Sequence, residues 1–231
     1  MHLYALVSGP VDSSTMTGIG ERPVRQVEAG GLTAIVSYHD EVPATTKASA
    51  LAHHEVVTAV ADQAPTLPVR FGAAFQDRGS LVTMLGARAD ELQAAVRDIG
   101  ERVEYVVRPS GGVSARSPRA TTARAPADRQ QAEGGGRTYL LERLDEHRAW
   151  EQAAAVVVRQ LEAIDRSVAP LAVRGVERSG PLGPERCYLV DRARADQFRQ
   201  AVGDALAVDG VGIEVGGPLP PYTFAAAAAP A

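Results

Sequence analysis

The chain has 231 residues, 45% of them hydrophobic, which is enough for one large core or two small ones. A net charge of −4 and a pI of about 5.8 exclude a global attraction to nucleic acid or to an anionic membrane. One cysteine, Cys187, excludes an internal disulfide and a thiolate metal cage, and no run approaches the roughly 20 apolar residues of a membrane span. Residues 1–10 lack a signal-peptide pattern, so we expect a cytoplasmic protein.

The first half of the chain predicts a sheet with helices. A strand is expected over residues 2–7, and a hairpin over 24–29 and 32–37, because the Gly30-Gly31 pair tolerates positive φ. The second arm is the more hydrophobic and is expected to be the inner one. The next predicted elements are a helix over 48–61, a strand over 67–71, one helix from 80 to 99 that Gly100 ends, and a strand over 102–108.

Residues 110–137 have a different composition. Gly, Ser, Pro, Ala and Arg dominate, and neither the helical nor the strand period continues, so this stretch predicts a flexible linker or loop. Its five arginines are also compatible with an arm that binds nucleic acid. No aromatic residue lies among them to stack on bases, and we therefore interpret them as the charges of a solvated linker, with no nucleic-acid partner.

Helical periodicity resumes after this stretch. Apolar residues three or four apart predict one long helix over 138–168, or two helices that meet near His147. Strands over 171–176 and 186–190, a helix after Asp191 and a strand over 211–215 follow. If the strand over 102–108 is counted in front, the order is the βαββαβ of a ferredoxin-like sandwich; the sequence leaves open which half owns that strand.

We therefore expect an α+β fold of two lobes, each an antiparallel, partly mixed sheet covered by helices on one face, with a ferredoxin-like C-terminal lobe. The expected domains are an N-terminal α+β domain over 1–109, a linker over 110–137, a C-terminal domain over 138–224 and a disordered tail over 225–231.

The stretch 217–224 contains three prolines. Because proline fixes φ and lacks a backbone donor, we expect a fixed, non-helical, extended element that packs back across a lobe or a lobe interface. Leu219, Tyr222 and Phe224 are its expected apolar anchors.

Catalytic and cofactor motifs are absent from the sequence, so we predict no enzyme, no cofactor and no metal site. The cluster His53-His54-Glu55 gives no chelating pair one helical turn apart, and we interpret it as a polar helix edge or a hydrogen-bonded structural histidine. His147, beside Trp150 on an apolar stripe, is expected in a core or an interface. Cys187 is expected to be a small core residue.

Arg70 is the charged residue that stands out, because it lies between Val69 and Phe71 on a short apolar strand. It must face solvent or be buried against a carboxylate, and we favour an ion pair that ties the strand to a helix over ligand recognition. Arg70 and Phe71 join Leu219, Tyr222 and Phe224 as candidates for a structural or partner-binding role.

Three segments of the chain occur in the order in which a known family has similar ones: Leu67-Pro68-Val69-Arg70-Phe71-Gly72, Glu104-Tyr105-Val106-Val107-Arg108 and Gly217-Pro218-Leu219-Pro220-Pro221-Tyr222-Thr223-Phe224. By these and other segments the chain resembles the GvpF and GvpL family of gas-vesicle accessory proteins. The resemblance implies a non-enzymatic role in gas vesicle formation, through contact with the small, very hydrophobic shell protein and with other accessory proteins, in the cytoplasm and at the vesicle.

Physical chemistry is consistent with this implication, since a shell subunit must expose apolar surface before it assembles, and an accessible sheet edge or apolar groove can cover that surface. The alternative is a small-molecule-binding regulatory module built from paired ferredoxin-like domains.

Overall fold

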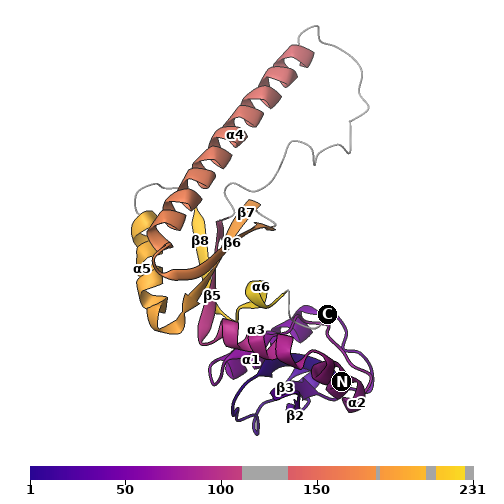
Figure 1. Cartoon of the computed structure of the whole chain (residues 1–231). Helices are drawn as coiled ribbons and strands as arrows, with labels where there is room; N and C mark the ends of the chain where they lie inside the picture. Colours follow the sequence, from indigo (N-terminus) through magenta and orange to yellow (C-terminus); the bar gives the residue numbers. More distant parts are fainter. Residues whose placement is uncertain (111–134, 181–182, 207–211, 227–231) are drawn as a thin grey trace. The chain divides into compact units, whose positions relative to one another are not determined.

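The computed structural model describes residues 1–110, 135–180, 183–206 and 212–226 (Figure 1). The chain divides into two compact units. The first unit comprises Met1–Tyr105, Leu189–Ala195 and the chain from Gly217 onward, and the second comprises Val106–Tyr188 and Asp196–Gly216.

The first unit contains one four-stranded antiparallel sheet with the strand order β2-β3-β1-β4. Its elements are β1 (His2–Val7), the 3-10 turn η1 (Ile19–Glu21), β2 (Arg25–Ala29), β3 (Leu32–Ser37), α1 (Lys47–Ala61), β4 (Thr66–Pro68), α2 (Arg78–Ala87) and α3 (Ala89–Ile99). The predicted hairpin is confirmed: Ala29 pairs with Leu32, and the φ angles of Gly30 and Gly31 are 59° and 71°. The more hydrophobic arm, β3, is the inner one.

Helices cover both faces of this sheet, not one. On β3, the side chains of Ala34 and Val36 pack with the buried leucines of α2 and α3, whereas Ile35 packs with the buried valines of α1. Because successive side chains of a strand point to opposite faces, these are two separate cores. The prediction of helices on one face is therefore wrong for this lobe.

The helix predicted over 80–99 is two helices. The chain leaves helical geometry at Arg88, whose φ and ψ are −118° and 19°. Asp90 and Glu91 fill the first turn of α3, where acidic side chains stabilise a new helix N-terminus, and the Arg88 guanidinium also donates to Glu91. The apolar spacing continues across the break, so periodicity alone did not reveal it.

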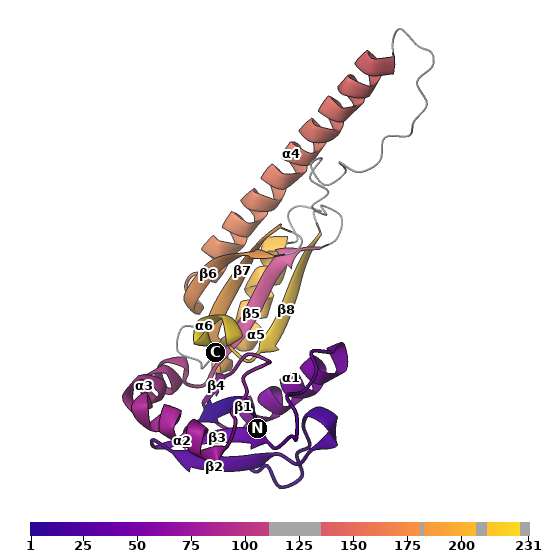
Figure 2. The ribbon, with the colours of Figure 1, turned by 90° about the vertical axis from the view of Figure 1, so that its right-hand side faces the viewer.

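The second sheet has the strand order β6-β7-β5-β8, which Figure 2 shows with the four strands side by side. The elements are β5 (Arg102–Pro109), α4 (Gly135–Val168), β6 (Ala172–Gly180), β7 (Gly183–Asp191), the 3-10 turn η3 (Arg192–Arg194), α5 (Ala195–Leu206), β8 (Ile213–Leu219) and the short α6 (Tyr222–Ala225). The order β5-α4-β6-β7-α5-β8 with this strand arrangement is ferredoxin-like, as predicted. The strand predicted over 102–108 belongs to this sheet.

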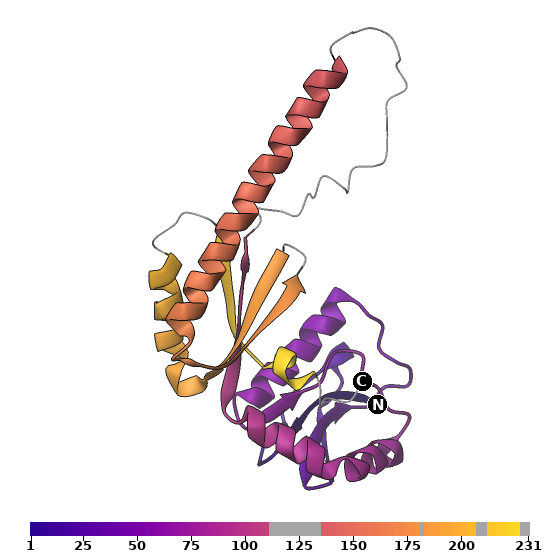
Figure 3. The same cartoon turned by 45° about the horizontal axis from the view of Figure 1, so that its top comes forward.

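Residues 135–168 form a single 34-residue helix, α4. The prediction of one long helix is therefore confirmed, and its alternative of two helices that meet near His147 is wrong. Figure 3 shows α4 and α5 on one face of the second sheet, with α4 extending past the ends of the strands. Within the described residues, no helix combines the length and the apolar composition of a membrane span.

Several predicted boundaries differ from the structure. Residues 135–137, expected in the linker, form the first turn of α4, and the rest of that prediction, 111–134, lies outside the described residues. Ala225, expected in a disordered tail, ends α6 and is 1% exposed, because it packs into the core beneath α2 and α3. Residues 227–231 lie outside the described residues. The compact units also interleave along the chain, unlike the consecutive expected domains.

Candidate functional site

The proline-rich end of the chain packs within the first unit. The segment is extended through Leu219, the last residue of β8, and the Gly217–Pro218 peptide bond is cis. Pro220 and Pro221 are buried, and the helical turn α6 then begins at Tyr222, so the prediction of a non-helical element is wrong for residues 222–224. A proline is tolerated at a helix N-terminus, where its missing N–H would have no helical partner.

A buried carboxylate fixes this turn. The Glu104 side chain, in a residue only 3% exposed on β5, accepts hydrogen bonds from the Thr223 backbone N–H at 2.8 Å and from the Thr223 hydroxyl at 2.6 Å. The carboxylate thereby satisfies one of the N–H groups that the start of a helix leaves without a helical partner. The terminal element is held by a charge-assisted contact as well as by apolar packing.

Tyr222, Leu219 and Phe224, the predicted anchors, are half-buried. The Tyr222 hydroxyl lies 3.5 Å from Nδ1 of His54 on α1, at the limit of a hydrogen bond. Burial, and then the nearby Glu104 charge, raise the pKa of Tyr222 above its ordinary value, so the phenol remains protonated. Of these three candidates, Tyr222 packs against the core between the sheet and α1.

Two cavities border this segment in the first unit. One, of about 30 Å³, lies between Thr58, Val103 and Leu219. The other, of about 170 Å³, is bordered by the ion pairs Arg102–Asp191 (2.9 Å) and Arg192–Asp62 (3.0 Å). Both cavities are smaller than the roughly 300–1,000 Å³ of ordinary small-molecule sites. The guanidinium groups beside them already form ion pairs with carboxylates of the same unit.

Arg70 and Phe71 do not lie on a strand, because β4 ends at Pro68. Arg70 is exposed and makes no ion pair with any described residue, so the favoured ion-pair interpretation is wrong and its solvent-facing alternative holds. Phe71 is half-buried, with its ring centroid 5.6 Å from that of His2 and 5.7 Å from that of His53.

A hydrogen-bonded pair of histidines lies beside Phe71 in the core. Nε2 of His53 lies 2.9 Å from the Val69 carbonyl oxygen, which can only accept, so this nitrogen carries the proton. Nδ1 of a neutral His53 then accepts, and Nε2 of His2, 2.8 Å away, must donate to it. Burial lowers the pKa of both side chains, that of His2 to about 3.

This geometry supports the interpretation of His53 as a structural histidine. Sequence reasoning missed His2, although a histidine inside an otherwise apolar strand was a usable signal. The Tyr4 ring stacks on that of His53, and a separate set of hydrogen bonds runs from the Tyr4 hydroxyl to Ser37 Oγ (2.8 Å) and from Ser37 Oγ to His39 Nε2 (2.7 Å). Ser37 is 0% exposed, which places its hydroxyl out of reach of a substrate.

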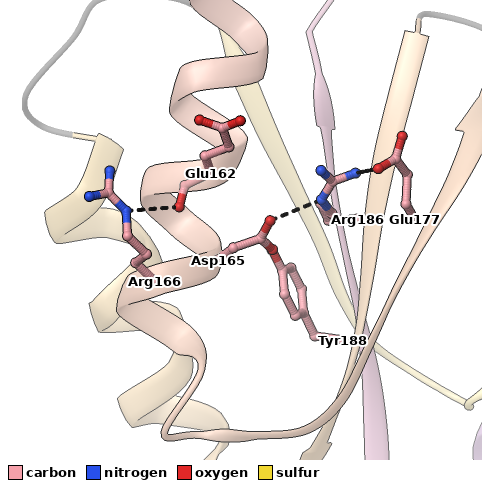
Figure 4. A network of polar contacts seen from close by, with 6 residues as sticks. All are labelled: Glu162, Asp165, Arg166, Glu177, Arg186 and Tyr188. Carbon is pink, nitrogen blue, oxygen red and sulfur yellow. Dashed lines mark hydrogen bonds and ion pairs between the residues drawn. The ribbon is translucent and has the colours of Figure 1, made fainter.

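A second polar network lies in the second unit (Figure 4). Asp165 of α4 accepts from Arg186 Nε at 3.0 Å and from the Tyr188 hydroxyl at 2.5 Å, and Arg186 also pairs with Glu177. These contacts join α4 to β7 and β6. Burial and then the Asp165 carboxylate raise the pKa of Tyr188, which keeps its proton in this contact.

The remaining candidates from the sequence are also placed. His147 is exposed, with its Nε2 3.3 Å from the Glu151 carboxylate one turn along α4, so its expected place in a core is wrong, and its place at an interface stays a prediction. Cys187 is fully buried, as expected. Among the residues that the structure describes, no three His, Cys, Asp or Glu side chains converge to hold a metal ion.

The fold and these contacts describe a two-unit α+β protein whose internal polar groups fix its own structure, and comparison with known proteins supplies the class. The sequence profile of the family described as "Gas vesicle synthesis protein GvpL/GvpF" matches residues 1–226, and the chain belongs to this family. The expected membership is confirmed. The family consists of gas vesicle accessory proteins and is not a known enzyme family, and its members act in gas vesicle formation.

Individual relatives agree with this assignment. The chain is 31% identical to gas vesicle protein F of Streptomyces sp. (strain CB03234), over 94% of each chain. It is 29% identical to gas vesicle protein L of the same strain, over 90% of this chain and 85% of the relative. The crystal structure of GvpF from Anabaena sp. PCC7120 superposes with a TM-score of 0.73 at 18% identity, over 97% of this chain and 94% of the other, so the two share their fold. GvpF from Microcystis aeruginosa gives a TM-score of 0.69 at 17% identity, over 97% and 98% of the chains.

Proposed function

We propose that this chain is a non-enzymatic accessory protein that binds the hydrophobic gas vesicle shell protein during assembly, in the cytoplasm and at the growing vesicle. The family membership supports the process, and the surface of the second unit supports the mode of binding. A shell subunit has apolar surface exposed until it joins the wall, and a partner that covers this surface prevents wrong association.

The observation that carries the proposal is the edge strand β6. It is nine residues long, has β7 as its one neighbour among the described strands, and is exposed from Val173 to Ser179. Val173 and Val176 are 44% and 42% exposed, among the few large apolar side chains that the described surface presents. An edge of this kind can take up an extended segment by main-chain hydrogen bonds, while its apolar side chains contact those of the segment.

Two substitutions that place charged side chains on the β6 edge test this surface. Val173→Glu together with Val176→Glu should raise the dissociation constant for purified shell protein by at least about tenfold, since two carboxylates would be desolvated at an apolar contact. Binding is measured with immobilised shell protein. Val42→Glu with Leu51→Glu is the matched control, because it adds the same two charges at apolar residues that are 73% and 54% exposed but lie in the first unit.

Either of two results contradicts part of the proposal. If the unaltered protein binds no shell protein, the proposed function is wrong. If it binds and the double variant binds equally well, the function stands and the β6 edge is not the contact. Contacts with other accessory proteins belong to the same proposal and are measured with the same variants.

The regulatory-module alternative rested on paired ferredoxin-like domains. In the described residues only the second sheet has that topology, whereas the first is built in the order β1, β2, β3, α1, β4. A metabolite screen by thermal shift remains the direct measurement of that alternative.

A further inference from the structure

A polar groove lies between α4 and α5 in the second unit. Its volume is about 660 Å³, and its lining includes Arg159, Gln160, Ala163, Arg166, Asp204 and Ala205. This volume falls within the roughly 300–1,000 Å³ of ordinary small-molecule sites, unlike the volumes of the two cavities beside the terminal segment. The small alanine side chains, one from each helix, leave room between the charged groups for a ligand of metabolite size.

The two arginines of the groove differ from others of the same unit. Those that contact a carboxylate in this unit are Arg108, Arg148, Arg178, Arg186 and Arg199. Arg159 and Arg166 contact no carboxylate of the described residues, and both border the groove. Figure 4 shows Arg166 on the side of α4 away from Arg186, so the network around Asp165 does not engage it. The α4 side of the groove therefore presents two positive charges to an anion.

The spacing of the two arginines lets both guanidinium groups reach one anion. Arg159 and Arg166 are seven residues apart, so they lie on the same face of α4, about 10 Å apart along its axis, with Ala163 between them. The Arg166 side chain turns back toward Arg159, since its Nε donates at 3.3 Å to the main-chain oxygen of Glu162, one turn nearer to Arg159. This hydrogen bond uses Nε and leaves the two terminal nitrogens of Arg166 for an acceptor in the groove.

The rest of the lining suits hydroxyl groups. Asp204 on α5 is exposed and forms no ion pair with a described residue, and its carboxylate can only accept hydrogen bonds. Gln160 is only 5% exposed, which places a polar amide in the inner wall of the groove. Asp204 repels a bare anion, whereas a ligand with a negative group at one end and hydroxyl groups at the other matches both sides of the groove.

We propose that this groove binds a phosphorylated sugar, up to the size of a nucleoside monophosphate. The phosphate lies between Arg159 and Arg166, and the sugar hydroxyls donate to Asp204. A phosphate ester carries close to two negative charges on three terminal oxygens, so two guanidinium groups can share it, whereas one guanidinium fork is enough for a carboxylate. The site makes the chain responsive to a metabolite, a property separate from the binding of shell protein.

Isothermal titration calorimetry on the full chain tests the site, with ribose 5-phosphate, adenosine monophosphate, inorganic phosphate and ribose as probes. Both sugar phosphates should bind more tightly than inorganic phosphate, and ribose should not bind. The groove variant, Arg159→Gln with Arg166→Gln, should raise the dissociation constant of ribose 5-phosphate at least about tenfold, because charge-assisted hydrogen bonds are lost. Asp204→Ala should raise that constant at least about threefold and should not weaken the binding of inorganic phosphate.

All three substituted residues are exposed, and circular dichroism and thermal melting verify that each variant folds. Arg25→Gln with Arg78→Gln is the matched control, since it removes two exposed arginines from the first unit, and it should bind like the unaltered chain. Absence of binding by both sugar phosphates, or binding that the groove variant does not weaken, overturns the proposal. Inorganic phosphate that binds as tightly as ribose 5-phosphate, with no effect of Asp204→Ala on either, would show an adventitious ion only and would also overturn it.

Discussion

At the scale of single residues, two buried polar side chains of the first unit connect segments that are far apart in the sequence. Glu104 receives both of its hydrogen bonds from Thr223, and His53 connects His2 to the Val69 carbonyl oxygen. A buried polar group without a partner destabilises a fold by about 1–3 kcal/mol, so each contact also selects one packing of the elements around it.

The histidine pair predicts how stability depends on pH. The pKa of His2 falls from 6.5 to about 3 in the folded state, and that of His53 is also lowered. Between about pH 6.5 and the lowered folded-state values, the unfolded chain binds protons that the folded chain does not, so stability falls as the pH falls. The loss is at most about 1.4 kcal/mol per pH unit for each histidine.

The variant His53→Gln tests whether the histidine pair causes this loss of stability at low pH, since the glutamine amide keeps a donor for the Val69 carbonyl and an acceptor for His2. Its free energy of unfolding in urea should decline less from about pH 7 to about pH 5 than that of the unaltered chain. His147→Gln removes an exposed histidine on α4 without altering this pair and is the control variant. An unchanged slope in the His53 variant would show that other groups cause the acid sensitivity.

At the scale of elements, the terminal segment from Gly217 to Ala225 is part of the first unit. Pro220, Pro221 and Ala225 are buried, and the start of α6 supplies the donors for Glu104. A proline-rich segment loses less conformational entropy on docking than a flexible one, and this favours its use as a fixed terminal element.

A chain truncated after Gly216 should therefore lose about 3 kcal/mol or more of stability, because buried apolar surface is exposed and Glu104 is left without its donors. Urea denaturation measures the loss. A chain that ends at Ala226 keeps α6 and is the matched control, expected to unfold like the full chain. Equal midpoints for the two truncations would mean that the segment contributes no stability.

At the scale of the whole molecule, the units interleave along the chain. The first unit needs Leu189–Ala195 and the terminal segment in addition to Met1–Tyr105. Within this unit, the Arg192 side chain donates to Asp62 at 3.0 Å and to the Ala61 carbonyl at 2.9 Å, and its backbone N–H donates to Glu101 at 3.0 Å. The expected N-terminal domain, residues 1–109, lacks all of these contacts.

A fragment of residues 1–109 should consequently melt at a lower temperature than the full chain, or without a cooperative transition, in circular dichroism. The control is the full chain with residues 111–134 replaced by a Gly/Ser stretch of equal length. That stretch contains Val113 as its only large aliphatic residue, so the melting temperature should remain nearly the same. A fragment that melts like the full chain would contradict the interleaved assignment.

Local sequence signals determined much of the architecture. Gly30-Gly31 predicted the hairpin, because positive φ is accessible to glycine, and apolar spacing predicted most helices and the βαββαβ order of the second sheet. The ordered set of family segments identified the family. A glycine pair, an apolar period and an ordered set of segments can all be recognised in the sequence without knowledge of tertiary contacts.

Only the tertiary structure decided which polar residues are internal. Glu104 follows the alternation of apolar and polar residues along its strand, and its partner Thr223 is 119 residues away in the sequence. His2 and His53 are separated by 51 residues. The split at Arg88 and the helical turn at Tyr222 likewise depend on packing that the apolar period does not record. A buried charge or histidine is tolerated only where the fold places a hydrogen-bond partner beside it, because that hydrogen bond offsets the cost of desolvation. The position of the partner depends on the tertiary structure and not on the local sequence of either segment.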